Sequence, residues 1–76
     1  MKALIEYCAR QLVDLPDGVH VDEHDNGGTI VLTLRVAPGD LGKVIGREGR
    51  TAQAMRLILA AAASAQGRRA TLEIAD

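Results

Sequence analysis

The sequence predicts a small α+β domain in which a three-stranded sheet carries its helices on one face. The chain has 76 residues, so we expect residues 1–76 to form one domain around a single hydrophobic core. Two long segments have the apolar period of an amphipathic helix, and three shorter ones alternate like half-buried strands. Each predicted strand has one apolar and one polar face, and helices on one side of the sheet bury all three apolar faces.

The first predicted helix covers residues 2–14. Charged residues of alternating sign recur at every fourth position, as on a solvated helix face. Pro16 and Gly18 end this helix, because proline disfavours helical geometry at the residue before it. The apolar face is predicted to consist of Leu4, Ile5, Cys8, Leu12 and Leu15.

Two strands joined by a tight turn are predicted next. Residues 19–25 alternate weakly, and residues 29–36 alternate clearly between aliphatic and polar side chains. Asn26 and Gly27 are expected to be the central pair of a type I′ hairpin turn, because both central residues of that turn have positive φ.

A short helix over residues 41–45 is predicted after a turn at residues 38–40. Asp40 stands at the N-cap position, where we expect its carboxylate to accept hydrogen bonds from the first free N–H groups of the helix. Gly46 and Gly49 then bound a sharp turn, which separates this helix from the next one.

The long helix that follows covers residues 50–66, and Gly67 is its expected C′ residue. Its apolar side chains fill an arc of about 200°, whereas packing on one sheet requires about 100°. Either the N-terminal helix or a second subunit covers the surplus. Residues 69–75 alternate again and form the third predicted strand.

Composition and charge narrow the classes of function. Tyr7 is the only aromatic residue, which disfavours the RRM, OB-fold and cold-shock modules, since these stack bases on aromatic side chains. Residues 1–40 carry three basic and seven acidic side chains, and residues 41–76 carry six basic and three acidic ones. The basic segment favours contact with an anion.

No catalytic or metal-binding constellation is predicted. His20, Asp22 and His24 share one strand face, but three ligands in a straight row converge poorly on one ion, so we expect them to be solvated. Cys8 is expected to be a small core residue, because no base can be placed beside it. With no signal peptide and no apolar run of membrane length, we expect a cytoplasmic protein that is not an enzyme and has no cofactor.

The turn between the two C-terminal helices carries the strongest functional signal. Gly46 and Gly49 leave backbone N–H groups unshielded, and the helix N-terminus that follows favours an anion. Lys43, Arg47 and Arg50 lie within reach of the same place. The spacing fits neither a P-loop nor a dinucleotide fingerprint, so it predicts phosphate binding without catalysis.

The segment 44–49, with the sequence VIGREG, resembles the VIGxxG signature of KH domains. The predicted element order resembles the type II (prokaryotic) KH arrangement, helix–strand–strand–helix–helix–strand. Residues 38–52 are very similar to the central segment of the KhpA family of small bacterial single-KH proteins. The resemblance covers essentially the whole chain.

This resemblance implies single-stranded RNA binding. In KH domains the GxxG backbone clamps about four nucleotides, and an apolar groove beside it receives the bases. By motif position, residues 46–49 would contact the sugar–phosphate backbone and residues 44–45 would form the floor of the groove. We add Lys43 and Arg50 because they flank this segment in the sequence. The predicted RNA-binding residues are therefore Lys43, Val44, Ile45, Gly46, Arg47, Glu48, Gly49 and Arg50.

The resemblance also implies partners. KhpA-like proteins form homodimers, or pair with the larger KH-containing protein KhpB, in RNA binding and in the control of cell division or envelope growth. We therefore expect an RNA chaperone or post-transcriptional regulator with no membrane or small-molecule partner. The alternative is a protein–protein adaptor, in which the KH fold serves dimerisation and RNA is bound mainly by a partner. The negative charge of Glu48 in the loop favours this alternative.

Overall fold

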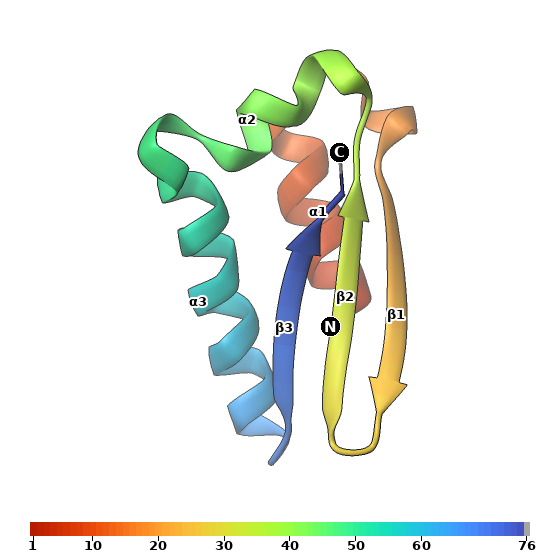
Figure 1. Cartoon of the computed structure of the whole chain (residues 1–76), viewed down its shortest axis with the longest axis vertical. Coiled ribbons are helices and arrows are strands. Elements are labelled where there is room, and N and C mark those ends of the chain that lie inside the picture. The colour runs from red at the N-terminus through yellow and green to blue at the C-terminus, as the bar shows by residue number, and fades with distance from the viewer. Residues whose placement is uncertain (76) are drawn as a thin grey trace.

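Three α-helices and a three-stranded sheet make up the computed structural model, which describes residues 1–75 (Figure 1). Short 3₁₀ segments connect several of these elements. The observed order confirms the predicted order, and the chain is an α+β domain. In chain order the elements are α1 (Lys2–Leu12), β1 (His20–Asn26), β2 (Thr29–Arg35), α2 (Leu41–Ile45), α3 (Arg50–Ala65) and β3 (Arg69–Ile74).

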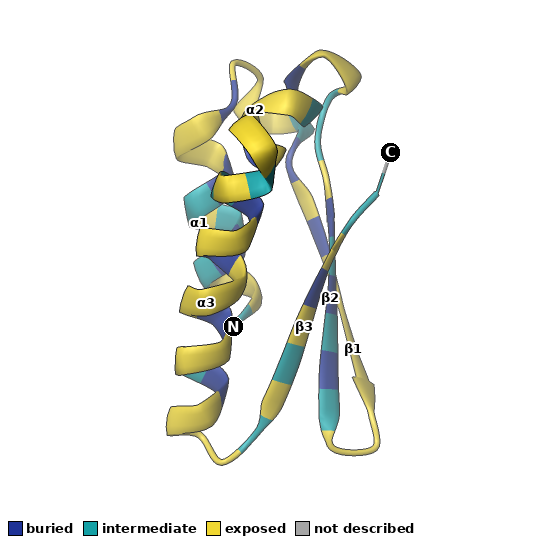
Figure 2. Ribbon diagram, turned by 60° about the vertical axis from the view of Figure 1, so that its left-hand side comes forward, coloured by how far each residue is buried: buried dark blue, intermediate teal, exposed yellow. Residues whose placement is uncertain are grey.

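The sheet has the strand order β1-β2-β3, with β2 in the centre. β1 and β2 pair antiparallel through their hairpin, whereas β2 and β3 pair in parallel, with Thr29 opposite Arg69 and Leu34 opposite Ile74. A parallel pair needs a long crossover, and here α2 and α3 supply it. The helices lie on one side of the sheet, as predicted (Figure 2).

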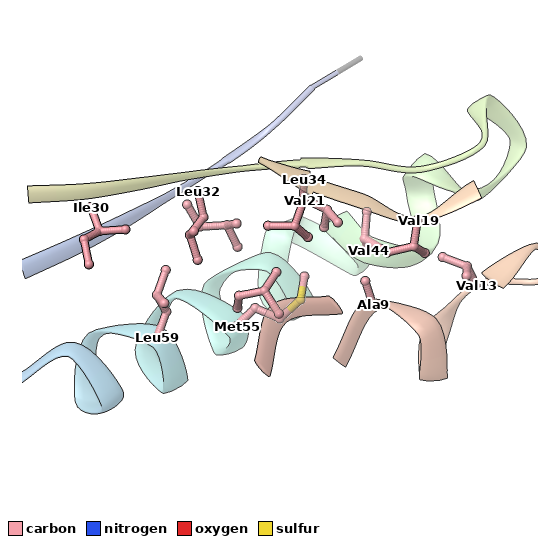
Figure 3. Close-up of a cluster of buried hydrophobic side chains, with 12 residues drawn as sticks. Ala9, Val13, Val19, Val21, Ile30, Leu32, Leu34, Val44, Met55 and Leu59 are labelled. Atoms are coloured by element: carbon pink, nitrogen blue, oxygen red, sulfur yellow. The ribbon is translucent and has the colours of Figure 1, made fainter. Parts of the chain in front are cut away.

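The hydrophobic core fills the space between the helix layer and the sheet (Figure 3). Alternate side chains of β2 point into it, which confirms the predicted period of two. Val44 of α2 is also fully buried there, so the core holds the helix that precedes the glycine-bounded turn. The cluster consists of Ile5, Ala9, Val13, Val19, Val21, Ile30, Leu32, Leu34, Val44, Met55, Leu59 and Leu72.

The first helix is shorter than predicted. It ends at Leu12, and Val13 is extended, with φ −95° and ψ 159°. Val13 therefore turns inward and is buried, while Leu12 and Leu15 are exposed. Placing those two leucines on the apolar face was wrong. Leu12 is the last helical residue and is 38% exposed, and Leu15 lies beyond the helix, where helical periodicity no longer applies.

The hairpin turn lies one residue later than predicted. Its central residues are Gly27 and Gly28, with φ of 66° and 120°, while Asn26 remains in β1 opposite Thr29. The requirement for two positive φ values was correct. Two adjacent glycines meet it at lower steric cost than Asn26 and Gly27 would.

The long helix ends as predicted at Gly67, which has φ 68°. The N–H of Gly67 donates to the carbonyl of Ser64 (2.9 Å), and the N–H of Arg68 donates to the carbonyl of Ala63 (2.8 Å). These two bonds form a Schellman motif, which stops the helix and directs the chain into β3.

The N-terminal helix does not cover the surplus apolar surface of α3. Leu57 is 71% exposed and Ile58 is 46% exposed. In residues 1–75, no helix combines the length and the apolar character that crossing a bilayer requires.

Candidate nucleic-acid interface

The segment Gly46–Gly49, called the GxxG loop below, lies where α2 gives way to α3 at one end of the molecule (Figure 1). Gly46, Glu48 and Gly49 have φ of 76°, 56° and 75°. The N–H of Gly49 donates to the carbonyl of Gly46 (3.1 Å), which closes a tight turn. A positive φ therefore occurs at three of the four positions, and glycine adopts it at two of them without steric cost.

The two glycines of the loop are required for different reasons. Gly46 lies against α3, and a Cβ at this position would come within 2.7 Å of Thr51 Cβ and 2.9 Å of its backbone nitrogen. A Cβ at Gly49 would meet no atom within 4 Å. Gly46 thus allows a close approach as well as a positive φ, whereas Gly49 supplies the positive φ alone.

Glu48 is the only residue other than glycine with a positive φ in the described part of the chain. Its carboxylate lies 3.5 Å from the guanidinium of Arg50, and both side chains are largely exposed. An exposed pair of this kind contributes little to stability. Because Glu48 is paired with Arg50, the cation free to meet a phosphate at the tip is Arg47, which is exposed and forms no ion pair with residues 1–75.

Lys43 forms ion pairs with two carboxylates outside the GxxG loop. Its ammonium lies 3.2 Å from the Asp14 carboxylate and 3.5 Å from that of Asp40. The contact with Asp14, together with the negative charge of Asp40, raises the pKa of Lys43 above its ordinary value. Lys43 is therefore close to the loop in the chain, but its charge is paired with Asp14 after α1 and with Asp40 before α2.

Asp40 is buried, with 3% of its surface exposed. Its carboxylate accepts hydrogen bonds from the N–H groups of Leu15 (3.0 Å) and Asp14 (3.2 Å). The prediction that this carboxylate caps the helix over residues 41–45 was wrong: Asp40 occupies the N-cap position but makes no side-chain capping bond. The reason is that the extended backbone after α1 presents free N–H groups, and burying those without a partner is costly.

The pKa of Asp40 reflects competing effects. Burial alone would raise it, but the backbone hydrogen bonds from Leu15 and Asp14 and the charge of Lys43 outweigh burial. The pKa is therefore held below its ordinary value, and the carboxylate stays ionised at neutral pH.

The two apolar residues before the loop differ in exposure. Val44 is fully buried in the core, whereas Ile45 is 37% exposed. Ala52, in the first turn of α3, is also buried. Ile45 therefore provides the apolar surface beside the loop, while Val44 packs α2 against the core.

Arg56 is a residue of this region that sequence reasoning missed. Its Nε donates to the carbonyl of Leu72 (3.2 Å), and this bond links the second turn of α3 to β3. The only sequence signal was a charged residue one turn after Ala52 on a helix that is otherwise rich in alanine. Its partner is a backbone atom 16 residues away, which side-chain patterns do not identify.

The residues weighed as metal ligands lie elsewhere. His20, Asp22 and His24 are exposed on β1, and Asp22 pairs with Arg35 at 3.8 Å. Within the described residues, no group of three or more histidine, cysteine or acidic side chains is arranged to hold a metal ion.

Comparison with known proteins gives a consistent result. The family model described as "KhpA/KhpB, KH domain" matches residues 2–74. A protein of Halalkalibacterium halodurans named "RNA-binding protein KhpA" is 53% identical over 76 residues, all of both chains. Proteins of the same name from Clostridium acetobutylicum and Aquifex aeolicus are 49% and 46% identical. They cover 97% and 100% of this chain, and the alignments span 99% and 96% of the relatives.

Proposed function

The chain belongs to the KhpA/KhpB KH-domain family, and on this premise we propose that it binds single-stranded RNA without catalysing a reaction. The observation that carries the proposal is the backbone of the GxxG loop. Three of its four residues have a positive φ, and they form a tight turn directly before the N-terminus of α3. A backbone turned in this way, close to the positive end of a helix dipole, suits a phosphodiester.

We assign roles to the loop and its neighbours on this basis. Residues 46–49 contact the sugar–phosphate backbone, with Arg47 supplying the free positive charge. Arg50 adds charge that Glu48 partly offsets. Ile45 offers the apolar contact for a base, and Val44 and Lys43 act behind this surface by holding α2 in place.

Phosphate contacts dominate such an interface, so we expect weak binding that is sensitive to salt. With about two engaged cations, the slope of log K against log salt concentration is expected to be about −1.4. A third engaged cation, Lys43, would bring the slope to about −2.

The direct test is fluorescence anisotropy of a labelled single-stranded RNA pool. The protein is compared with Arg47→Asp/Glu48→Asp, in which both changed side chains are exposed and Asp tolerates the left-handed φ of Glu48. Lys2→Asp is the control, because it makes the same change of charge in the first turn of α1, where a negative charge is favoured. We expect binding to be lost only in the loop variant, with circular dichroism unchanged in both. Equal binding by the two variants would refute the proposal.

A second candidate function is a protein–protein adaptor. The exposed Leu57 and Ile58 on α3 favour it. A single exposed apolar residue is ordinary, but these two are adjacent. The alanine-rich surface around them allows another helix to approach closely. Such pairing is compatible with RNA binding, and we include a homodimer or a KhpB-like partner in the proposal. By family resemblance, we further propose a cytoplasmic RNA chaperone or post-transcriptional regulator connected with cell division or envelope growth.

A further inference from the structure

β1 forms one edge of the sheet, and Figure 1 shows no helix or strand of the described chain beyond it. The other edge strand, β3, packs against α3, and Arg56 of that helix donates to the carbonyl of Leu72. An edge strand presents a row of unpaired N–H and C=O groups that another strand can join, and proteins often protect it by keeping it very short. β1 is seven residues long and therefore offers such a row.

The register of the hairpin identifies the unpaired backbone groups. Asn26 and Thr29 flank the two-residue turn, and in such a turn the carbonyl of the first residue accepts from the N–H of the fourth. Hydrogen-bonded and non-hydrogen-bonded pairs then alternate along the antiparallel ladder. The backbone groups of Val21, Glu23 and Asp25 therefore face away from β2. No hydrogen bond outside the ladder engages them within residues 1–75.

The side chains around this edge are acidic. Residues 14–25 contain no lysine or arginine and five acidic residues, which are Asp14, Asp17, Asp22, Glu23 and Asp25. Asp22 is paired with Arg35, and Asp25 accepts a hydrogen bond from Arg68. Glu23 is exposed and forms no ion pair within residues 1–75. The middle of the open edge therefore carries an uncompensated negative charge.

This charge decides which strand can occupy the edge. Two copies of β1 paired edge to edge would bring the acidic side chains of both copies together, and like charges across paired strands are destabilising. An extended segment rich in lysine and arginine places the opposite charge at the same positions. The acidic side chains thus act against pairing with a second copy and favour a basic strand.

From this arrangement we propose that the outer edge of β1 binds an extended, basic segment of a partner protein as a fourth strand. The backbone groups of Val21, Glu23 and Asp25 supply the hydrogen bonds, and lysine or arginine side chains of the segment lie beside Glu23. The GxxG loop precedes α3, which packs on β3 at the far side of the sheet (Figure 1). The two surfaces are separate, so this inference does not depend on RNA binding.

The test uses ¹H–¹⁵N correlation spectra of the full chain. The chain is titrated with an end-blocked synthetic peptide, seven residues long like β1, in which lysine and valine alternate. A peptide with glutamate in place of lysine is the comparison. We expect the amides of residues 20–26 to shift with the basic peptide only, and the amides of Val21, Glu23 and Asp25 to gain protection from hydrogen exchange.

Two results overturn the proposal. The first is an equal response to the two peptides, or no response to the basic one. The second is a shift of these amides with the concentration of the chain alone, which would mean that a second copy occupies the edge.

Two variants separate the backbone contact from the charge. Glu23→Pro removes an outward N–H and keeps the ladder bonds of β1, so it should abolish binding of the basic peptide with circular dichroism unchanged. Glu23→Lys keeps the backbone and reverses the charge, and it should weaken binding about fivefold. Binding by Glu23→Pro as tight as that of the parent chain would exclude pairing at this edge.

The control Glu73→Lys makes the same reversal of charge at an exposed position of β3. We expect it to leave binding of the basic peptide unchanged, because β2 separates β3 from the open edge. A loss for Glu73→Lys equal to that for Glu23→Lys would mean a general charge effect and would refute the site.

Discussion

The carboxylate of Asp40 accepts a 3.0 Å hydrogen bond from the N–H of Leu15, which lies 25 residues earlier in the chain. This bond joins the backbone after α1 to the residue directly before α2. Since α2 leads directly into the GxxG loop, the orientation of the loop depends on a buried carboxylate that is not part of it. The candidate RNA interface is therefore supported by a polar contact as well as by the core.

Replacing Asp40 by Asn tests this support. The amide of Asn has one acceptor oxygen in place of two and no charge for Lys43, so we expect Asp40→Asn to lower the free energy of unfolding. Asp17→Asn, at an exposed position, is the control. Urea denaturation followed by circular dichroism measures both. Equal midpoints for the two variants would contradict the structural role of Asp40.

The same carboxylate predicts a pH dependence of stability. Because the pKa of Asp40 is lower in the folded chain, the unfolded chain binds more protons in acid, and stability falls as pH drops from the ordinary Asp value of about 3.9 toward the folded pKa. Above that window the contribution is fully present. We expect urea midpoints measured from pH 6 down to about pH 3 to decline less steeply in Asp40→Asn than in the parent chain. If the urea midpoints of the two chains declined in parallel, the lowered pKa of Asp40 would be contradicted.

The two loop glycines are predicted to differ in their tolerance of alanine. Gly49→Ala should cost about 1–2 kcal/mol of unfolding free energy, which is the price of a left-handed residue in open space. Gly46→Ala should cost more, because its Cβ would also collide with Thr51. Glu48→Gly relieves a positive φ and should be neutral or stabilising. Chemical denaturation of the three variants measures their unfolding free energies. If Gly49→Ala lowered the unfolding free energy as much as Gly46→Ala, the close approach of Gly46 to Thr51 would be contradicted.

The salt dependence of RNA binding should distinguish Arg47 from Lys43. Arg47→Gln is expected to reduce the magnitude of the log–log slope by about 0.7, since Arg47 forms no ion pair within residues 1–75. Lys43→Gln should change the slope little, because Asp14 and Asp40 already neutralise that charge. Anisotropy titrations at several salt concentrations give the slopes. An equal effect of both substitutions would show that Lys43 turns toward RNA on binding.

The exposed apolar surface of α3 predicts self-association. Leu57→Glu should shift sedimentation toward the monomer and leave the thermal midpoint of the dilute protein nearly unchanged, because Leu57 contributes little to the core. Gln53→Glu adds the same charge at an exposed position of the same helix and serves as the control. A protein that sediments as a monomer at all concentrations, with or without Leu57→Glu, would exclude the homodimer.

Local patterns predicted most of the fold correctly. Alternation in β2 and β3, the start of α2 and the C′ position of Gly67 depend on residues close together in the chain, and the structure confirms each of them. The GxxG loop was found in the same way, because glycine spacing between two helices is a local signal. Errors arose at element ends, such as the extended Val13, where a buried contact outweighed helical periodicity.

The sequence by itself determined the order of elements, the inward faces of the strands and the position of the loop, because backbone preference and apolar period act over a few residues. Only the tertiary structure decided where the polar side chains point. The bond from Leu15 to Asp40, the pairing of Lys43 with Asp14 and the bond from Arg56 to Leu72 all join distant residues. Buried backbone groups and charges take whichever partner folding brings within reach, so these contacts exist only once the helices lie on the sheet.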